Sequence, residues 1–343
     1  MSLQTALLQA ARYTGMFHLS DRLSARQLRV LGYHGFAFED EHLFRPKLFM
    51  RVALFAARMA WLAQHDYWVI TLEEARTRLK DGTLRSKSVV ITLDDGFYSV
   101  LALVLPILKR YGFPATLYMT TYYCRRPNPI FRLVVQYMFW ATPKSLLDLS
   151  GLLPGSEDLT STCGEAGEHT QWRIIEHGEV ALSEDERLAI VEELGKRLGV
   201  DYGKIRDSRK FSLLTEDEVA HLAQEGLEIQ LHTHRHQLLN DPGLAHREIE
   251  DNRNVLAPLT GQPLHHLCYP SGLWSKNLWP VLEALGVDTA TTCEPGLVSA
   301  DTPSLAWPRI LDADSIPPIV FEAEISGFKS QLRTLKGFLK RRL

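Results

Sequence analysis

The stretch Val89-Val90-Ile91-Thr92-Leu93-Asp94-Asp95-Gly96-Phe97 decides the fold that we expect for this chain. It opens with a run of apolar and β-branched residues that is too short for a helix, and Asp-Asp-Gly closes the run. The pattern predicts a buried strand that ends in a sharp turn. Two carboxylates then lie together at a strand end, which a bound cation or a functional base would explain. Asp-Asp-Gly is also ordinary turn chemistry, so the stretch alone leaves both interpretations open.

A second strand end carries three histidines. The alternating run Leu227-Glu228-Ile229-Gln230-Leu231 is followed by His232-Thr233-His234-Arg235-His236. One helical turn or a tight loop would direct the imidazoles of His232 and His236 to a single point, because the two residues are four positions apart. With a strand-end aspartate they provide the N, N, O donor set of a catalytic metal that keeps open positions.

These segments resemble the motifs of the NodB-type polysaccharide deacetylases (carbohydrate esterase family 4). Thr92-Leu93-Asp94-Asp95-Gly96 is similar to the first motif, and His232-Thr233-His234-Arg235-His236 is similar to the second, His-Ser/Thr-x-x-His. Cys268-Tyr269-Pro270-Ser271-Gly272 resembles the Tyr-Pro-x-Gly segment of many members. The resemblance runs from about residue 30 to about residue 311, with a non-matching region inside it. It implies an α/β fold, a distorted (β/α) barrel of the NodB-homology type with a helical and irregular insertion.

The resemblance also implies a metal centre. It assigns metal binding to Asp95, His232 and His236, and the role of base to Asp94. The expected cofactor is a divalent ion, Zn²⁺ first and Co²⁺ or Ni²⁺ as alternatives, which acidifies a water and polarises an amide carbonyl. The expected reaction is removal of N-acetyl groups from an amino sugar in a polysaccharide or glycan precursor.

The third segment is expected to contact the reacting group and the substrate. The backbone N–H of Tyr269 is expected to share the developing oxyanion with the metal, a contribution of about 3–4 kcal/mol in comparable sites. Substrate binding is expected from Pro270, Gly272 and Trp274.

The chain departs from the family pattern in two places. Members usually carry a late Leu-x-x-His whose imidazole protonates the leaving amine, but no histidine follows His266 here. His34, after a predicted strand at 29–33, is the expected replacement, with Gly35 behind it to let a substrate approach. A hydrogen-bonded structural histidine is the alternative interpretation. The Arg that precedes the third motif in many members is also missing, and Arg309 is expected to replace it.

Helix and strand patterns alternate along most of the chain. Helices are predicted at 47–64 and 98–111, with Pro106 inside the second, and a strand at 115–121. This is the pattern of parallel βαβ units, whose active sites gather at the C-terminal ends of strands. We expect a peripheral N-terminal helix (1–28), a deacetylase domain (29–320) with an insertion at about 125–210, and a basic helical tail (321–343).

Composition narrows the class of protein. The chain has 343 residues, of which 45% are hydrophobic and 23% charged, as in ordinary soluble globular proteins. Its net charge of −3 gives no reason to expect a nucleic-acid partner. The four cysteines form no Cys-x-x-Cys pair, and there is neither an export signal nor an apolar run of membrane-spanning length. We expect a cytoplasmic protein, with contact of the basic tail with the inner membrane face as a further option.

Three other classes share parts of this pattern. Non-haem iron oxygenases use a His/His/Asp site, but their jelly-roll fold requires strands without intervening helices. Metal-dependent amidohydrolases of other kinds carry His-x-His, which His232-Thr233-His234 resembles, but in that family it ends the first barrel strand. A catalytically inactive carbohydrate-binding relative would keep the fold and lose the acid. Release of acetate, together with the identity of the metal, distinguishes these classes.

Overall fold

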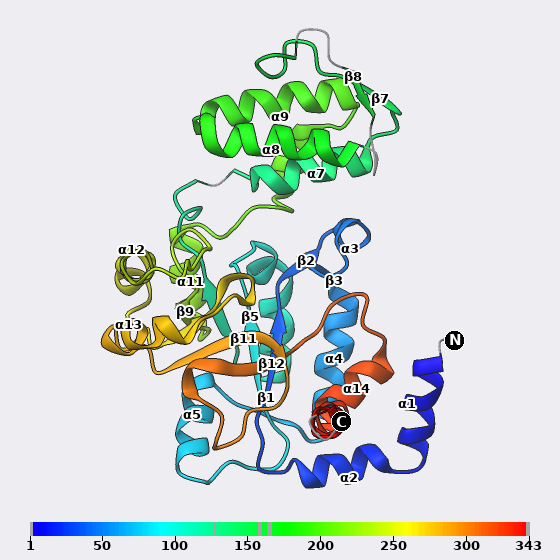
Figure 1. Ribbon diagram of the computed structural model, residues 1–343, viewed down its shortest axis with the longest axis vertical. Helices are drawn as coiled ribbons and strands as arrows, with labels where there is room; N and C mark the ends of the chain where they lie inside the picture. The colour runs from blue at the N-terminus through cyan, green and yellow to red at the C-terminus, as the bar shows by residue number, and fades with distance from the viewer. Residues whose placement is uncertain (1–2, 127, 157–159, 163–166, 341–343) are drawn as a thin grey trace. The chain divides into compact units, whose positions relative to one another are not determined.

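The computed structural model describes residues 3–126, 128–156, 160–162 and 167–340. The chain divides into two compact units. The barrel unit comprises Met1–Arg125 and Leu214–Leu343, and the insert unit comprises Arg126–Leu213. Each unit has its own helices and strands (Figure 1).

A closed ring of seven parallel strands forms the centre of the barrel unit within the described residues. In ring order the strands are β1 (Arg29–Tyr33), β12 (Trp307–Leu311), β11 (Thr289–Pro295), β10 (His266–Cys268), β9 (Glu228–Leu231), β6 (Thr116–Met119) and β5 (Ser88–Leu93). β1 closes the ring because Leu31 pairs with Ile310 on one side and with Ile91 on the other. A short strand, β4 (Trp68–Val69), pairs with the start of β5. The predicted (β/α) barrel is confirmed.

The apolar run before Asp94 forms β5, and both faces of this strand are buried. Helices outside the ring cover the strands, so a continuous apolar run is stable in this position. A strand of alternating apolar and polar residues would bury its polar side chains away from water. The surrounding helices are α4 (Val52–Gln64), α5 (Leu72–Lys80), α6 (Leu105–Tyr111), α11 (Glu216–Gln224), α12 (Pro242–Thr260) and α13 (Trp279–Ala284). Short helical turns lie at Glu41–Phe44 (α3), Pro270–Gly272, Lys276–Leu278 and Ser304–Ala306.

Two predicted helices differ from the structure. The helix expected at 98–111 starts as a π-helical turn, Val100–Val104, and becomes α-helical only at Leu105. Pro106 lies in the first turn of that α-helix, where its missing N–H leaves no bond unmade. The helix expected at 47–64 starts at Val52, because Phe49–Arg51 forms a strand, β3, that pairs with β2 (Gly35–Ala37).

The two ends of the chain pack together in the barrel unit. The N-terminal region predicted as one helix forms two, α1 (Leu3–Tyr13) and α2 (Met16–Leu23), separated at Gly15 with φ of 78°. Near the other end, α14 (Pro318–Ile325) spans the boundary expected at 320, and α15 (Phe328–Lys340) follows. Leu8, Ala11, Phe17, Ile319, Ala323 and Phe328 form a small apolar cluster among these four helices.

The insert unit is mainly helical. It contains α7 (Phe131–Ala141), α8 (Glu168–Ala181), α9 (Glu184–Leu198), α10 (Tyr202–Ser208) and an antiparallel pair, β7 (Leu146–Asp148) with β8 (Thr160–Thr162). Ser183 and Glu186 form a capping box at the start of α9. Within the described part of the whole chain, no helix has the length and apolar character that crossing a bilayer requires.

Candidate active site

The residues of the first two motifs meet at one mouth of the barrel. Asp94 and Asp95 follow β5 directly, and His232 follows β9. His34 follows β1, and Arg309 lies within β12. All these strands are parallel, so their C-terminal ends open on the same side and bring the five side chains together.

One carboxylate and two imidazoles form a compact donor set at this mouth. Asp95 Oδ1 lies 3.2 Å from Nε2 of His232 and 3.2 Å from Nε2 of His236. The three ligand atoms lie within 4.8 Å of one another, and no other group of His, Cys, Asp or Glu in the described residues does so. The His232 side chain is 2% exposed and the His236 side chain 38%, so the set is closed on one side and open on the other.

Electrostatics favour charge separation in this set. Burial by itself raises the pKa of Asp95, but hydrogen bonds from His232 and His236 outweigh it and hold the pKa well below the ordinary value. Burial likewise lowers the pKa of His232, and the hydrogen bond and charge of Asp95 reverse this into a net increase. An ionised carboxylate beside two imidazoles is a suitable set of ligands for one cation.

The backbone of both motifs is held in the left-handed region. Asp95 (φ 71°), Thr233 (φ 65°) and His236 (φ 55°) are three of the seven non-glycine residues with positive φ in the described chain. Such conformations cost on the order of 1–3 kcal/mol each and are concentrated at functional sites. Gly96 (φ 90°) also has no space for a side chain, because an added Cβ would lie 2.0 Å from the Met119 sulfur.

Hydrogen bonds from neighbouring elements orient His232. Its Nδ1–H donates to the carbonyl oxygen of Cys268 at 2.8 Å, so Nε2 is the ring nitrogen that faces Asp95. Its backbone N–H donates to Asn252 Oδ1 at 3.0 Å, and Asn252 Nδ2 donates to the Met119 carbonyl at 3.0 Å. A buried asparagine of α12 therefore ties the end of β9 to the end of β6.

The rest of the histidine loop is held by other contacts. Thr233 Oγ1 accepts from the backbone N–H of Gln237 at 3.1 Å, and Glu248 accepts from the backbone N–H of Arg235 at 2.7 Å. His234 lies outside the donor set: its Nδ1 is 2.9 Å from Thr121 Oγ1. The structure thus gives no support to the His-x-His arrangement of other amidohydrolases.

Asp94 is buried beside a buried arginine. Arg309 Nη1 donates to Asp94 Oδ1 at 2.8 Å and to Thr92 Oγ1 at 3.1 Å, while His34 Nε2 lies 3.6 Å from Asp94 Oδ2. The Cys268 thiol lies 3.7 Å from the same oxygen. Burial by itself raises the pKa of Asp94, but the charges of Arg309 and His34 outweigh it and lower the pKa. Asp94 is therefore an ionised carboxylate, able to accept a proton.

His34 lies at the mouth, but Gly35 has a different role from the one expected. The side chain of His34 is 25% exposed, so it faces both Asp94 and solvent. Gly35 belongs to β2, where an added Cβ would lie 2.5 Å from the ring of Phe49. The glycine is required by packing between β2 and β3, and the structure does not show that it gives room to a substrate.

The backbone N–H of Tyr269 is not available to an oxyanion. It donates to the carbonyl oxygen of Thr291 at 3.1 Å, which continues the pairing between β10 and β11. The tyrosine side chain is buried, and its hydroxyl donates to the Leu305 carbonyl at 2.9 Å. The role that the sequence motif suggested for this N–H is therefore wrong, because strand pairing takes up the donor.

Pro270, Gly272 and Trp274 follow β10 on the mouth side of the barrel. An added Cβ on Gly272 would lie 2.5 Å from the Cβ of Cys293, so this glycine serves close packing. Trp274 stacks on Trp279 with ring centroids 5.8 Å apart. The expected substrate contacts of these three residues stay predictions.

Sequence reasoning missed three residues that position the site. Cys268, Asn252 and Glu248 contact the motif residues, but none is a ligand or a base in any motif. Cys268 lies inside the third motif, but its contact is made by the backbone carbonyl, which no residue pattern indicates. Asn252 and Glu248 lie on α12, and polar residues on a helix ordinarily face solvent, so no local pattern indicated that they are buried.

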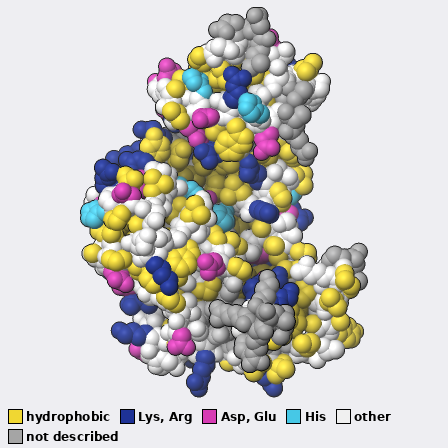
Figure 2. Space-filling model, viewed as in Figure 1, with side chains coloured by type: hydrophobic (Ala, Val, Ile, Leu, Met, Phe, Trp, Pro, Cys, Tyr) yellow, Lys and Arg dark blue, Asp and Glu magenta, His cyan; other side chains and the backbone are white. Residues whose placement is uncertain are grey.

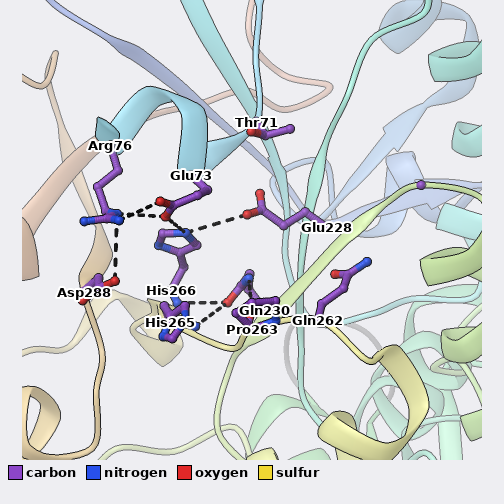
Figure 3. Close-up of a pocket in the computed structure, with 11 residues that line it drawn as sticks. Thr71, Glu73, Arg76, Glu228, Gln230, Gln262, Pro263, His265, His266 and Asp288 are labelled. Atoms are coloured by element: carbon purple, nitrogen blue, oxygen red, sulfur yellow. Dashed lines mark hydrogen bonds and ion pairs between the residues drawn. The ribbon is translucent and has the colours of Figure 1, made fainter. Parts of the chain in front are cut away.

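A separate cavity of about 390 Å³ lies at the other end of the barrel, where β9, β10 and β11 start (Figure 3). There Nε2 of His266 lies 3.3 Å from Glu73 and 3.7 Å from Glu228. Burial lowers the pKa of His266 to about 4 and raises that of Glu228. None of the predicted site residues lines this cavity.

Comparison with known proteins identifies the family. The family model described as polysaccharide deacetylase matches residues 81–144 and 191–290, which include Asp94, Asp95, His232 and His236. The Bacillus subtilis protein YxkH, whose name assigns it provisionally to the polysaccharide deacetylases, is 22% identical over 80% of this chain and 70% of its own. The poly-β-1,6-N-acetyl-D-glucosamine N-deacetylase of Escherichia coli K12 is 32% identical over 22% of this chain and 12% of its own.

Solved structures share the fold. The deacetylase PplD of Streptococcus pyogenes, in complex with acetate, has a TM-score of 0.58 and 17% identity, covering 88% of this chain and 99% of that one. IcaB of Ammonifex degensii has a TM-score of 0.53 and 16% identity, covering 88% and 97%. With its two motifs at one mouth of a closed parallel barrel, this chain belongs to the polysaccharide deacetylase family and is a deacetylase hydrolase.

Proposed function

We propose that this enzyme is a metal-dependent N-deacetylase that acts on an N-acetylated amino sugar in a polysaccharide or glycan precursor. The observation that carries the proposal is the placement of the Asp95, His232 and His236 donor set beside a buried, ionised Asp94. The amino-sugar substrate rests on the similarity to the Escherichia coli enzyme, whose name specifies an N-acetylglucosamine polymer.

The donor set fits a divalent ion. One carboxylate oxygen and two imidazole nitrogens are ligands that Zn²⁺ accepts, and Co²⁺ and Ni²⁺ accept them too. The carbonyl of Cys268 fixes His232 in the tautomer that a ligand requires. When bound, such an ion would supply Lewis acidity toward an acetamide carbonyl and stabilise developing negative charge.

The remaining residues handle the protons. Asp94 accepts a proton as water adds to the acetamide carbon, and Arg309 holds this carboxylate ionised and in place. The C–N bond then breaks, acetate leaves, and the amine takes a proton. His34, 3.6 Å from Asp94, is the residue that we propose donates it.

Acetate release is the direct test. The protein, stripped with a chelator, is incubated with N-acetylated glycans and precursors with and without Zn²⁺, Co²⁺ or Ni²⁺. We expect release of acetate only with metal and only from substrates with an acetamido group. Release that persists in the fully stripped protein would contradict metal dependence. Absence of release from every substrate by a folded, metal-loaded protein would favour an inactive carbohydrate-binding relative.

A further inference from the structure

Exposed apolar side chains are concentrated on the terminal helices. Half of the sixteen large hydrophobic residues that are exposed in the described chain lie on α1, α2 or α15. They include Leu3 (78% exposed), Leu7, Leu19, Leu23 (69%), Leu332 and Leu335. Such residues normally lie scattered over a protein surface, so their concentration indicates an interaction surface. Figure 2 shows hydrophobic side chains gathered over α1, at the lower right of the view.

An apolar groove runs through this surface. Its volume is about 610 Å³, and its walls include Leu7 and Leu8 of α1 and Phe328 and Leu332 of α15. The helices that form it are anchored: the rings of Phe17 and Phe328 lie 5.2 Å apart. Ser20 and Gln331 also exchange two hydrogen bonds of 2.9 and 3.2 Å. The groove is therefore part of the packed barrel unit.

The same segments are basic although the chain is acidic. Residues 1–27 and 326–343 contain nine Lys or Arg and one acidic residue, which leaves 29 basic and 40 acidic residues in the rest of the chain. Lys329 and Arg333 at the groove share Glu324 of α14. Lys336, also at the groove, and Arg22 are exposed, and the structure shows no ion pair for either among the described residues.

We propose that α1, α2 and α15 form a docking surface for an anionic phospholipid bilayer. Exposed leucines that enter the interfacial region, flanked by lysine and arginine that meet lipid phosphates, are the two features that hold a protein on such a surface. A symmetric contact with a second copy is less favourable, because it would bring two positively charged surfaces together. This inference is independent of the proposed substrate and metal.

Docking in this way leaves the candidate active site open. α2 leads into the N-terminal end of β1, whereas Asp94 and His232 lie at the C-terminal ends of their strands. α15, the red helix at the C mark in Figure 1, contacts α2 through the hydrogen bonds between Ser20 and Gln331. The bilayer therefore meets a part of the barrel unit other than its mouth, and a glycan can reach the site while the enzyme stays on the membrane.

Vesicle binding tests the proposal on the full chain. Co-sedimentation is measured with vesicles of phosphatidylcholine alone and of phosphatidylcholine mixed with phosphatidylglycerol, at low and high salt. We expect binding to the anionic vesicles, weakened by salt because exposed charges are screened. Leu19→Ser with Leu335→Ser, and separately Arg22→Glu with Lys336→Glu, are each expected to lower the partition coefficient at least about tenfold.

Matched controls change equally exposed residues elsewhere. Leu146→Ser with Leu239→Ser, and Lys80→Glu with Arg247→Glu, are expected to bind as the unchanged protein does, and thermal unfolding confirms that every variant is folded. Equal losses in surface and control variants, or equal binding to neutral and anionic vesicles, would overturn the proposal. So would a folded protein that binds no vesicle. Self-association in ultracentrifugation that is lost with Leu19→Ser and Leu335→Ser would assign the surface to a second copy.

Discussion

At the scale of single residues, the site separates two adjacent aspartates into different environments. Asp94 turns into the barrel toward Arg309, and Asp95 turns toward His232 and His236. Successive side chains at the end of a strand point to opposite sides, and the left-handed backbone of Asp95 (φ 71°) marks the turn that follows. One carboxylate can then hold a cation while its neighbour accepts a proton.

Substitutions should separate the two roles. Asp95→Ala, His232→Ala and His236→Ala are each expected to lose bound metal and activity together, because two remaining ligands are too few to hold the ion. Asp94→Asn is expected to keep its metal and lose turnover. Elemental analysis of the purified variants gives the metal content, and acetate release gives the activity. If Asp94→Asn lost as much metal as His232→Ala, the division of roles would be wrong.

The role of His34 can be tested with the leaving group. His34→Ala is expected to keep fold and metal and to lose about 10²-fold or more in turnover on amides, the scale of general acid catalysis. An aryl acetate ester should escape most of this loss, because its departing oxygen needs little protonation. The rates of His34→Ala on both substrates are compared with those of the control variant His65→Ala, which changes an exposed histidine of the same chain. Equal losses on amide and ester would refute the acid role.

At the scale of secondary-structure elements, α12 holds the ends of two barrel strands in place. Asn252 is buried and meets the backbone of His232 after β9 and of Met119 in β6. Neither contact involves a ligand atom of the candidate metal set. The position of the His232 imidazole therefore depends on a helix whose own residues take no part in the chemistry.

Removal of Asn252 should weaken metal binding without removing a ligand. Asn252→Ala leaves the His232 N–H unpaired, and loss of such an outer contact typically lowers metal affinity by about 10–100-fold. Competition with a chromogenic chelator measures the affinity. Asn254→Ala, an exposed asparagine on the same helix, is the matched control and should bind metal normally. Unchanged affinity in Asn252→Ala would show that the loop is held by its other contacts.

At the scale of the whole molecule, the stability of the barrel unit should depend on pH through His266. This histidine joins the start of β10 to Glu73 of α5 and Glu228 of β9, and its pKa falls to about 4 on burial. The unfolded chain, with an ordinary value near 6.5, binds more protons between these limits. The free energy of unfolding therefore decreases as the pH falls from about 6.5 to 4, by at most about 1.4 kcal/mol per unit.

A variant isolates this contribution from that of Glu228, whose raised pKa acts in the opposite direction. Urea unfolding of His266→Asn is expected to show a flatter pH dependence than the unchanged protein between pH 6.5 and 4. His265→Asn changes the exposed neighbouring histidine and should keep the original slope. Parallel pH curves for the unchanged protein and His266→Asn would show that His266 is not the group responsible.

The sequence by itself determined the fold class and predicted which residues meet at the mouth of the barrel. Runs such as Val89–Leu93 are buried on both faces, and such a strand is stable where helices cover the outer face of a barrel and side chains of the other strands fill its interior. In a parallel barrel every strand opens at the same mouth, so residues that follow strands, such as Asp95 and His232, were expected to meet. Both predictions depend only on the hydrophobic pattern of each strand and on the residues that directly follow it in the sequence.

Only the tertiary structure decided which groups are free and which are already bonded. The Tyr269 N–H pairs with Thr291, Gly35 accommodates Phe49, and Arg309 reaches Asp94 from a strand 215 residues away in sequence. Each fact depends on a partner distant along the chain, and no local periodicity specifies such a partner. The same holds for the membrane surface, because exposed leucines of α1 and α15 form one surface only after both ends of the chain have packed together.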